Sequence, residues 1–194
     1  IVGPSWVGDM VMAQSLYKAL RDQNPNCVID VLAPGWSLPV LSRMREVRNV
    51  IDQPTAHGEL AWGKRKTLGA QLATVGYSQA ILLPNSLKSA LIPAFAKIPV
   101  RTGWRGEYRY GLLTDIRLLN KSRYPLMVER FVALAFEIGA ALPAQLPRPE
   151  LSVDTHNQAK MLAEFSLSVE QPILALCPGA EFGPSKQWPA RHYA

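Results

Sequence analysis

An acidic residue in a glycine-containing turn at the start of the chain is the first candidate for chemistry. The stretch "GPSWVGDM" carries Gly3, Gly8 and Asp9. Glycines permit a tight turn from strand to helix, and such turns lie at the carboxyl edge of a parallel sheet, where α/β proteins bind their ligands. A helix dipole keeps a first-turn carboxylate ionised, and an ionised carboxylate that faces a ligand can take a proton from an attacking hydroxyl. Asp9 is therefore either a general base or an acid that only stabilises its helix.

The same turn does not fit a dinucleotide site. A dinucleotide-binding turn has the spacing G-x-G-x-x-G and leaves the helix N-terminus free for pyrophosphate. Here Gly3 and Gly8 are the only glycines of the turn, and the charge of Asp9 would repel a phosphate. A nicotinamide-dependent oxidoreductase is thus disfavoured. Trp6, in the same turn, is either a core or staple residue or an apolar platform for a sugar ring.

A second segment whose residues could take part in chemistry is "CPGAEFGPSKQWP", near the end of the chain. It has the composition of a strand end, a loop and a helix that begins at Pro189, because proline is favoured in the first helical turn. Lys186 stands just before this helix, where its ammonium group and the loop amides can hold a diphosphate. The alternative is an exposed lysine in an ordinary loop.

The charge of the chain favours anionic partners. Its 21 Lys and Arg against 15 Asp and Glu give a net charge of +6, which does not separate nucleic acid, phospholipid and phosphorylated sugar. Lys64, Arg65 and Lys66 form one basic run, and three arginines recur at four-residue spacing at 101, 105 and 109. Each group is either a solvated surface or part of a binding surface.

Several other classes of protein are excluded or disfavoured. No apolar stretch reaches the roughly 20 residues that a membrane-spanning helix needs, and no basic-then-apolar leader is present. Cys27 and Cys177 are isolated, and His57, His156 and His192 are scattered. These features predict a cytoplasmic protein without a metal site.

Short β-rich runs alternate with helical runs, a pattern typical of an α/β fold with a parallel sheet and helices on both faces. "IVG" reads as the tail of a first strand. We expect strands at 27–34, 48–54, 79–85 and 172–180, and helices at 9–22, 37–44, 60–75, 87–98, 125–138 and 155–165. Ser86 is expected to cap the helix at 87–98. The stretch "VRTGWRGEYRYGLLTD" at 100–115 is expected to be irregular, and long structured loops are often functional.

The segment "ALPAQLPRPEL" predicts a domain boundary because it contains Pro143, Pro147 and Pro149. We therefore expect an N-terminal domain at 1–141, a proline-rich linker at 142–151 and the beginning of a second domain at 152–194. The last part is too short to complete an α/β core. We expect a truncated fragment that is inactive in isolation.

Four segments together resemble the family of ADP-heptose:lipopolysaccharide heptosyltransferases: "GPSWVGDMVMAQSLYKAL", "LPNSLKSALIPAFAKIPVRTGWRGEYRYGLLTD", "YPLMVERFVALAF" and "CPGAEFGPSKQWP". The resemblance runs along nearly the whole chain. It implies a GT-B architecture, in which two Rossmann-like domains bind the acceptor mainly on the N-terminal side and the nucleotide sugar mainly on the C-terminal side. It also implies inverting transfer of heptose from ADP-heptose to a Kdo-lipid A-heptose acceptor at the inner face of the inner membrane, without a nucleic-acid partner.

The resemblance also implies roles for particular residues. Asp9 matches the family's candidate base, and Lys186, with Ser185 and Gly179 beside it, matches the donor side. The acceptor is phosphorylated and carries carboxylates, which suits basic side chains. The acceptor-side candidates are Trp6, Lys64, Arg65, Lys66, Lys88, Arg101 and Arg105. No cofactor is required, although a divalent cation can accompany the donor diphosphate.

Two alternatives remain open. A related glycosyltransferase would use another nucleotide sugar or acceptor, because the family's remaining donor contacts, an acidic residue and a later phosphate loop, match nothing in this chain. A non-catalytic module would bind nucleic acid or anionic surfaces through the basic clusters, with strongly salt-dependent affinity and no response to ADP-sugars.

Overall fold

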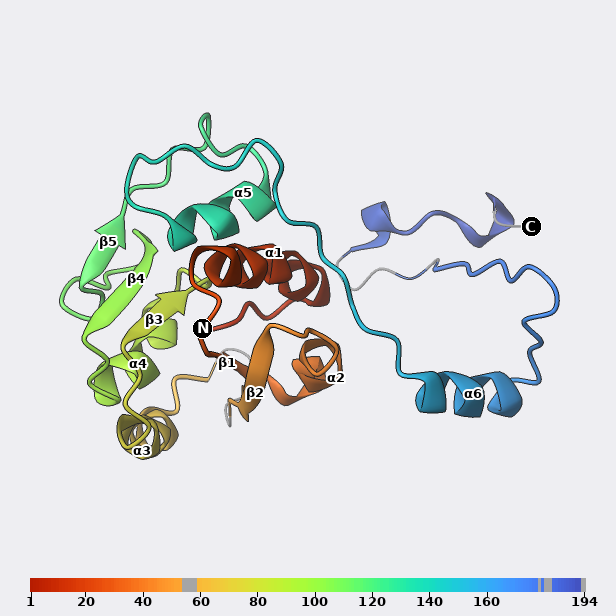
Figure 1. Cartoon of the computed structure of the whole chain (residues 1–194), viewed down its shortest axis with the longest axis horizontal. Coiled ribbons are helices and arrows are strands. Elements are labelled where there is room, and N and C mark those ends of the chain that lie inside the picture. Colours follow the sequence, from red (N-terminus) through yellow and green to blue (C-terminus); the bar gives the residue numbers. More distant parts are fainter. Residues whose placement is uncertain (54–58, 178, 180–182, 193–194) are drawn as a thin grey trace. The chain divides into compact units, whose positions relative to one another are not determined.

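A computed structural model describes residues 1–53, 59–177, 179 and 183–192 of the chain. It divides into two compact units, Ile1–Val153 and Asp154–Ala194, and we describe each by itself (Figure 1). His57 lies outside the described residues.

The first unit is built on a parallel sheet. Its strands are β1 (Ile29–Ala33), β2 (Val47–Asp52), β3 (Gln79–Leu82), β4 (Val100–Trp104) and β5 (Asp115–Arg117). Val2 forms parallel bridges to Leu32 and to Leu82, so the N-terminal segment lies between β1 and β3. The order is therefore β2, β1, N-terminal segment, β3, β4, β5, which is the doubly wound order of Rossmann-like folds. The predicted α/β fold and the strand character of "IVG" are confirmed.

Helices cover both faces of this sheet. They are α1 (Val7–Gln23), α2 (Leu38–Leu41), α3 (Trp62–Ala73), α4 (Leu91–Phe95) and α5 (Met127–Val132), with 3-10 turns at Gly35–Ser37, Leu87–Ala90 and Ala133–Ala135. Successive residues of a strand face opposite sides. Val31 thus joins a core cluster with Leu16 of α1 and Phe131 of α5, whereas Leu32 joins another with Ile92 of α4. Both faces of β1 are buried, which explains why its residues are apolar apart from Asp30.

The segment at 100–115 is not irregular as expected, because it contains β4 and the start of β5. β4 pairs with β3 on one side and with β5 on the other. Thr102, Gly103 and Trp104 are buried between these neighbours, and tertiary pairing outweighs the arginine- and glycine-rich composition. Only residues 105–114 connect the two strands, a short crossover for a parallel pair.

Ser86 does not cap its helix with its side chain. The backbone N–H of Leu87 instead donates to the carboxylate of Glu107, at 2.8 Å. The acceptor that satisfies this free helix-end donor comes from 20 residues along the chain. Capping at this position is therefore a tertiary contact that local sequence does not reveal.

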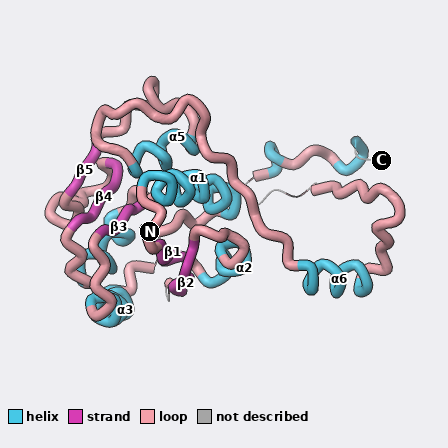
Figure 2. Tube along the Cα trace, viewed as in Figure 1, coloured by secondary structure: helices cyan, strands magenta, loops and turns pink. Residues whose placement is uncertain are grey.

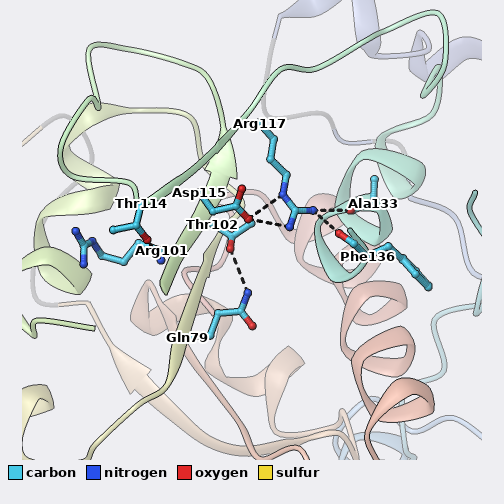
Figure 3. Close-up of polar contacts among 8 residues, drawn as sticks. All are labelled: Gln79, Arg101, Thr102, Thr114, Asp115, Arg117, Ala133 and Phe136. Carbon is cyan, nitrogen blue, oxygen red and sulfur yellow. Dashed lines mark hydrogen bonds and ion pairs between the residues drawn. The ribbon is translucent and has the colours of Figure 1, made fainter. Parts of the chain in front are cut away.

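β5 is fixed to the end of the α5 segment by a buried arginine (Figure 3). The guanidinium of Arg117 is paired with Asp115 at 2.8 Å and donates to the carbonyls of Ala133 at 3.0 Å and Phe136 at 2.6 Å. A cation at the carbonyl end of a helical segment satisfies free acceptors and complements the dipole.

The second unit contains α6 (Thr155–Glu164) and 3-10 turns at Pro184–Lys186 and Ala190–His192 (Figure 2). Asp154 caps α6 by accepting from the N–H of Asn157 at 2.9 Å. The strand expected at 172–180 is absent from residues 172–177 and 179, and positions 178 and 180 are outside the described residues. These loop residues are exposed, and no described strand of this unit pairs with them. The expected helix near Pro189 is a 3-10 turn.

The end of the proline-rich segment is attached to the first unit. Gln14 of α1 is fully buried. It accepts from the N–H of Glu150 at 2.8 Å and donates to the carbonyl of Glu150 at 2.9 Å. The N–H of Ser152 donates to the carbonyl of Arg43 at 2.8 Å. These contacts fasten residues 150 and 152; the division into domains with a linker at 142–151 stays a prediction.

A charged network joins the amino ends of three strands. Asp30 of β1 accepts from Nε of Arg48 at 2.9 Å and from the hydroxyl of Tyr77 at 2.6 Å. Burial alone would raise the pKa of Asp30, but the hydrogen bonds from Arg48 and Tyr77 outweigh it and hold the pKa below its ordinary value. Ionised Asp30 therefore stabilises the folded state.

Replacing Gln14 with Leu is expected to release the proline-rich segment, because the side chain loses both bonds to Glu150. We expect a loss of about 2 kcal/mol in the free energy of unfolding and faster amide exchange at 150. Hydrogen exchange measured by mass spectrometry tests this. Gln23→Leu is the control, since the side chain of Gln23 donates to the carbonyl of Ala19 in its own helix and, among the described residues, to no other segment. Unchanged exchange at 150 would contradict the assignment.

Replacing Asp30 with Asn is expected to destabilise the protein by about 1 to 2 kcal/mol at pH 7. The folded pKa of Asp30 is lower than its unfolded value of about 3.9, so its stabilisation is complete above the unfolded pKa and is lost as the pH falls through the folded pKa. The difference in Tm between the two proteins should therefore shrink below about pH 4. Thermal melts from pH 7 to 2.5 measure it, and a constant difference would be the contrary result.

Candidate functional site

Asp9 lies at the topological switch point of the sheet. Its helix, α1, follows the central N-terminal segment directly, and Asp9 is in the first helical turn, after Trp6 at the N-cap position. Its side chain is half-buried, and within the described part of the chain no hydrogen bond or ion pair engages its carboxylate. The carboxylate is thus unengaged at the carboxyl edge of the sheet, which is the edge where α/β proteins bind ligands. Its role as a base stays a prediction.

Trp6 does not pack in the core. It is 48% exposed and belongs to neither core cluster. A second exposed tryptophan, Trp36, follows β1 at the same edge of the sheet and was not predicted as a site residue. Trp36 follows Pro34 and Gly35, where a strand ends, and this position in the sequence could have indicated a residue at the ligand-binding edge.

The three basic residues at 64–66 lie on different sides of α3, so that two are exposed and one is buried. Lys64 and Lys66 of α3 are exposed, and Lys64 lies 3.6 Å from Glu59. Arg65 is only 1% exposed, and it donates to the carbonyls of Leu60 at 2.7 Å and Lys88 at 3.1 Å. Burial lowers the pKa of Arg65, and the nearby Glu59 opposes this. Arg65 therefore holds the backbone at Leu60 and Lys88 and is not part of the exposed surface of α3.

The cations around β3 and β4 also differ in whether their side chains are engaged within the fold. Arg101 is half-buried and donates to the carbonyls of Leu112 and Ile98, so its guanidinium is engaged by the backbone. Arg105 is exposed directly after β4, and Lys88 is half-buried after β3. In the described residues no side-chain hydrogen bond or ion pair occupies either of these two cations.

Several first-unit candidates whose charged groups are not engaged by the described residues follow strands that end at one edge of the sheet. Asp9, Lys88 and Arg105 follow the carboxyl ends of the N-terminal segment, β3 and β4, which are neighbours in the sheet. Parallel strands bring these ends to the same edge. A carboxylate and two cations at the same edge of a sheet provide a group that can take a proton from a hydroxyl and charges that can hold an anionic molecule.

The donor-side candidates belong to the second unit. Gly179, Ser185 and Lys186 are exposed, and the N–H of Lys186 donates to the carbonyl of Gly183 at 3.2 Å. Ser185 and Lys186 stand in the 3-10 turn Pro184–Lys186. The ammonium group of Lys186 is therefore open to solvent within its own unit.

Residues 1–53, 59–177, 179 and 183–192 contain no group of three or more His, Cys, Asp or Glu that could hold a metal ion. Among the same residues, no helix has the length and apolar character to cross a bilayer.

Known proteins resemble this chain closely. The model of glycosyltransferase family 9 (heptosyltransferase) matches residues 65–194. Lipopolysaccharide heptosyltransferase 2 of Salmonella typhimurium is 54% identical over 100% of this chain and 57% of its own length. Lipooligosaccharide heptosyltransferase 2 of Haemophilus influenzae is 54% identical over 100% of this chain and 58% of its own length.

A solved structure shares the fold. The Escherichia coli ADP-heptose lps heptosyltransferase II is 51% identical, with a TM-score of 0.90 over 99% of this chain and 57% of that chain. The predicted α/β fold of the GT-B type is confirmed. The chain spans somewhat more than half the length of the relatives it matches.

Cations that donate to the backbone and cations that are exposed are expected to differ in their effect on stability. Arg65→Ala should lower the free energy of unfolding by about 3 kcal/mol, because this buried side chain leaves a cavity and its backbone carbonyl acceptors lose a charged donor. Lys66→Ala, the control on the same helix, should change it by less than about 0.5 kcal/mol. Urea unfolding of both variants measures this, and equal stabilities would overturn the division.

Proposed function

Because the chain belongs to glycosyltransferase family 9, the heptosyltransferases, we propose that its protein transfers heptose from ADP-L-glycero-D-manno-heptose to the heptosyl-Kdo-lipid A inner core of lipopolysaccharide. The observation that carries the proposal is Asp9, an unengaged carboxylate in the first turn of the helix that follows the central segment of the sheet. The names of the relatives support the donor and the acceptor.

The proposed reaction is a single displacement with inversion. Asp9 takes the proton from an acceptor hydroxyl while that oxygen forms a bond to the anomeric carbon of the heptose. The bond from the anomeric carbon to the diphosphate breaks, and ADP leaves with the electron pair. Lys186 and the loop amides around it offset the charge on the departing diphosphate. No covalent sugar intermediate is formed, no cofactor is included, and a divalent cation on the diphosphate is compatible with the scheme.

The acceptor side is proposed to use the exposed cations of the first unit. Lys64, Lys66, Lys88 and Arg105 suit a phosphorylated acceptor, with Trp6 as an apolar platform for a sugar. Arg65 and Arg101 support this surface indirectly, by donating to the backbone carbonyls of Lys88 and Leu112. Since the acceptor is a lipid, we also propose that the protein works in the cytoplasm at the inner face of the inner membrane.

Asp9→Ala is expected to lower kcat by about 10²- to 10⁴-fold, the usual contribution of a general base. Asp9→Asn should fall to a similar level, because an amide keeps the shape of the side chain but cannot take the proton. The assay is transfer of labelled heptose from ADP-heptose to mono-heptosylated Kdo-lipid A by the full-length gene product.

The control variant is Asp22→Asn, an exposed acid near the other end of α1, which should keep full activity. Near-normal turnover by Asp9→Ala would remove Asp9 from its role. A folded wild-type protein that fails to transfer heptose would count against the donor or the acceptor. Other nucleotide sugars would then be assayed, and salt-dependent binding to nucleic acid without any transfer would support the non-catalytic alternative.

A further inference from the structure

We propose that Arg109 is a positioning residue for the acceptor side of this site. Resting on the proposed function, the inference concerns how the chain fixes Lys88 and Arg105, two of the proposed acceptor contacts. Arg109 lies in the crossover between β4 and β5, and only 2% of its surface is exposed.

The guanidinium of Arg109 joins two segments that are distant in sequence. It donates to the carbonyl of Pro84 at 2.8 Å, to Oγ of Ser89 at 3.3 Å and to Oδ1 of Asn85 at 3.3 Å. It also donates to the carbonyl of Trp104, the last residue of β4. One side chain thereby fixes both ends of the segment 84–89, which carries Lys88, to the strand end that precedes Arg105.

The backbone of the same crossover reinforces this attachment. The N–H of Glu107 donates to the carbonyl of Asn85 at 3.1 Å, and the Glu107 carboxylate accepts from the N–H of Leu87 at 2.8 Å. A Cβ atom at Gly106 would stand 2.3 Å from the carbonyl oxygen of Asn85. Only glycine permits this approach. The two segments therefore form one interlocked surface at the carboxyl edge of the sheet.

The charge of Arg109 adds to the effect of its geometry. Within the described part of the chain it has no ion pair, and its Nε has no hydrogen-bond partner. Burial lowers the pKa of Arg109 and the nearby Glu107 opposes this, but a guanidinium stays protonated in proteins. The hydrogen-bond acceptors of this buried guanidinium are carbonyl, hydroxyl and amide oxygens, which carry no net charge, so it contributes positive potential to the adjoining surface. That is the sign that a phosphorylated acceptor requires.

Kinetics of Arg109→Lys in the full-length protein test the proposal. Lysine keeps the charge but cannot bridge the same acceptors, so we expect the KM for the acceptor to rise about tenfold. Changes in kcat and in the KM for ADP-heptose should stay within about twofold, because neither the base nor the donor side is touched.

Arg117→Lys is the matched control. Arg117 is also buried and also donates to backbone carbonyls, but it serves β5 and the end of the α5 segment (Figure 3). It should lose stability without a change in the KM for the acceptor. An unchanged acceptor KM in folded Arg109→Lys, or an equal rise in Arg117→Lys, would overturn the inference.

A milder variant serves if Arg109→Lys does not fold. Asn85→Ala removes one acceptor of Arg109 at an exposed position, and we expect the acceptor KM to rise about two- to threefold together with faster amide exchange at 84–89. Faster exchange without any change in the acceptor KM would contradict the positioning role. Absence of heptose transfer by the wild-type protein would instead count against the proposed function, so the two failures are distinguishable.

Discussion

Parallel strand pairing around the N-terminal segment is the constraint on which the rest of the first unit depends. Val2 bridges both of its neighbours, so the chain reverses its direction of winding at this point. Every strand then ends at the same edge, and the residues that follow neighbouring strands are brought together. Asp9, Lys88 and Arg105 are far apart in the sequence, and this pairing brings the strand ends that precede them to one edge of the sheet.

Arginine side chains that donate to backbone carbonyls fix several segments that have no regular secondary structure. The crossover at 105–114 contains no helix, and yet it is fixed because Arg101 and Arg109 donate to backbone carbonyls around it. Arg65 and Arg117 act similarly at other loops and helix ends. An arginine offers several donors in a rigid fork, so one side chain can satisfy carbonyls from separate segments. The net positive charge of the chain is therefore only partly a surface property.

The two units offer complementary halves of the proposed chemistry. The first carries an ionisable acid and cations at a sheet edge, and the second carries an exposed lysine in a glycine- and proline-containing loop. The attachment of Glu150 to Gln14 ties the end of the proline-rich segment to α1, the same helix that carries Asp9. The first unit thus extends past the prolines.

The sequence by itself determined the α/β class and most helices and strands, because buried strands such as 29–33 and the turn at Gly3 and Gly8 have strong local patterns. It also indicated the family, through the resemblance of four of its segments. It did not reveal that 100–104 is a strand, that Glu107 caps Leu87, that Arg65 is buried, or that the guanidinium of Arg101 donates to backbone carbonyls. Each of these depends on contacts between residues distant in sequence, and composition is the same for a buried arginine as for an exposed one. Only the tertiary structure decided which cations hold the backbone and which remain available to a ligand, because burial and hydrogen-bond partners are properties of the folded chain.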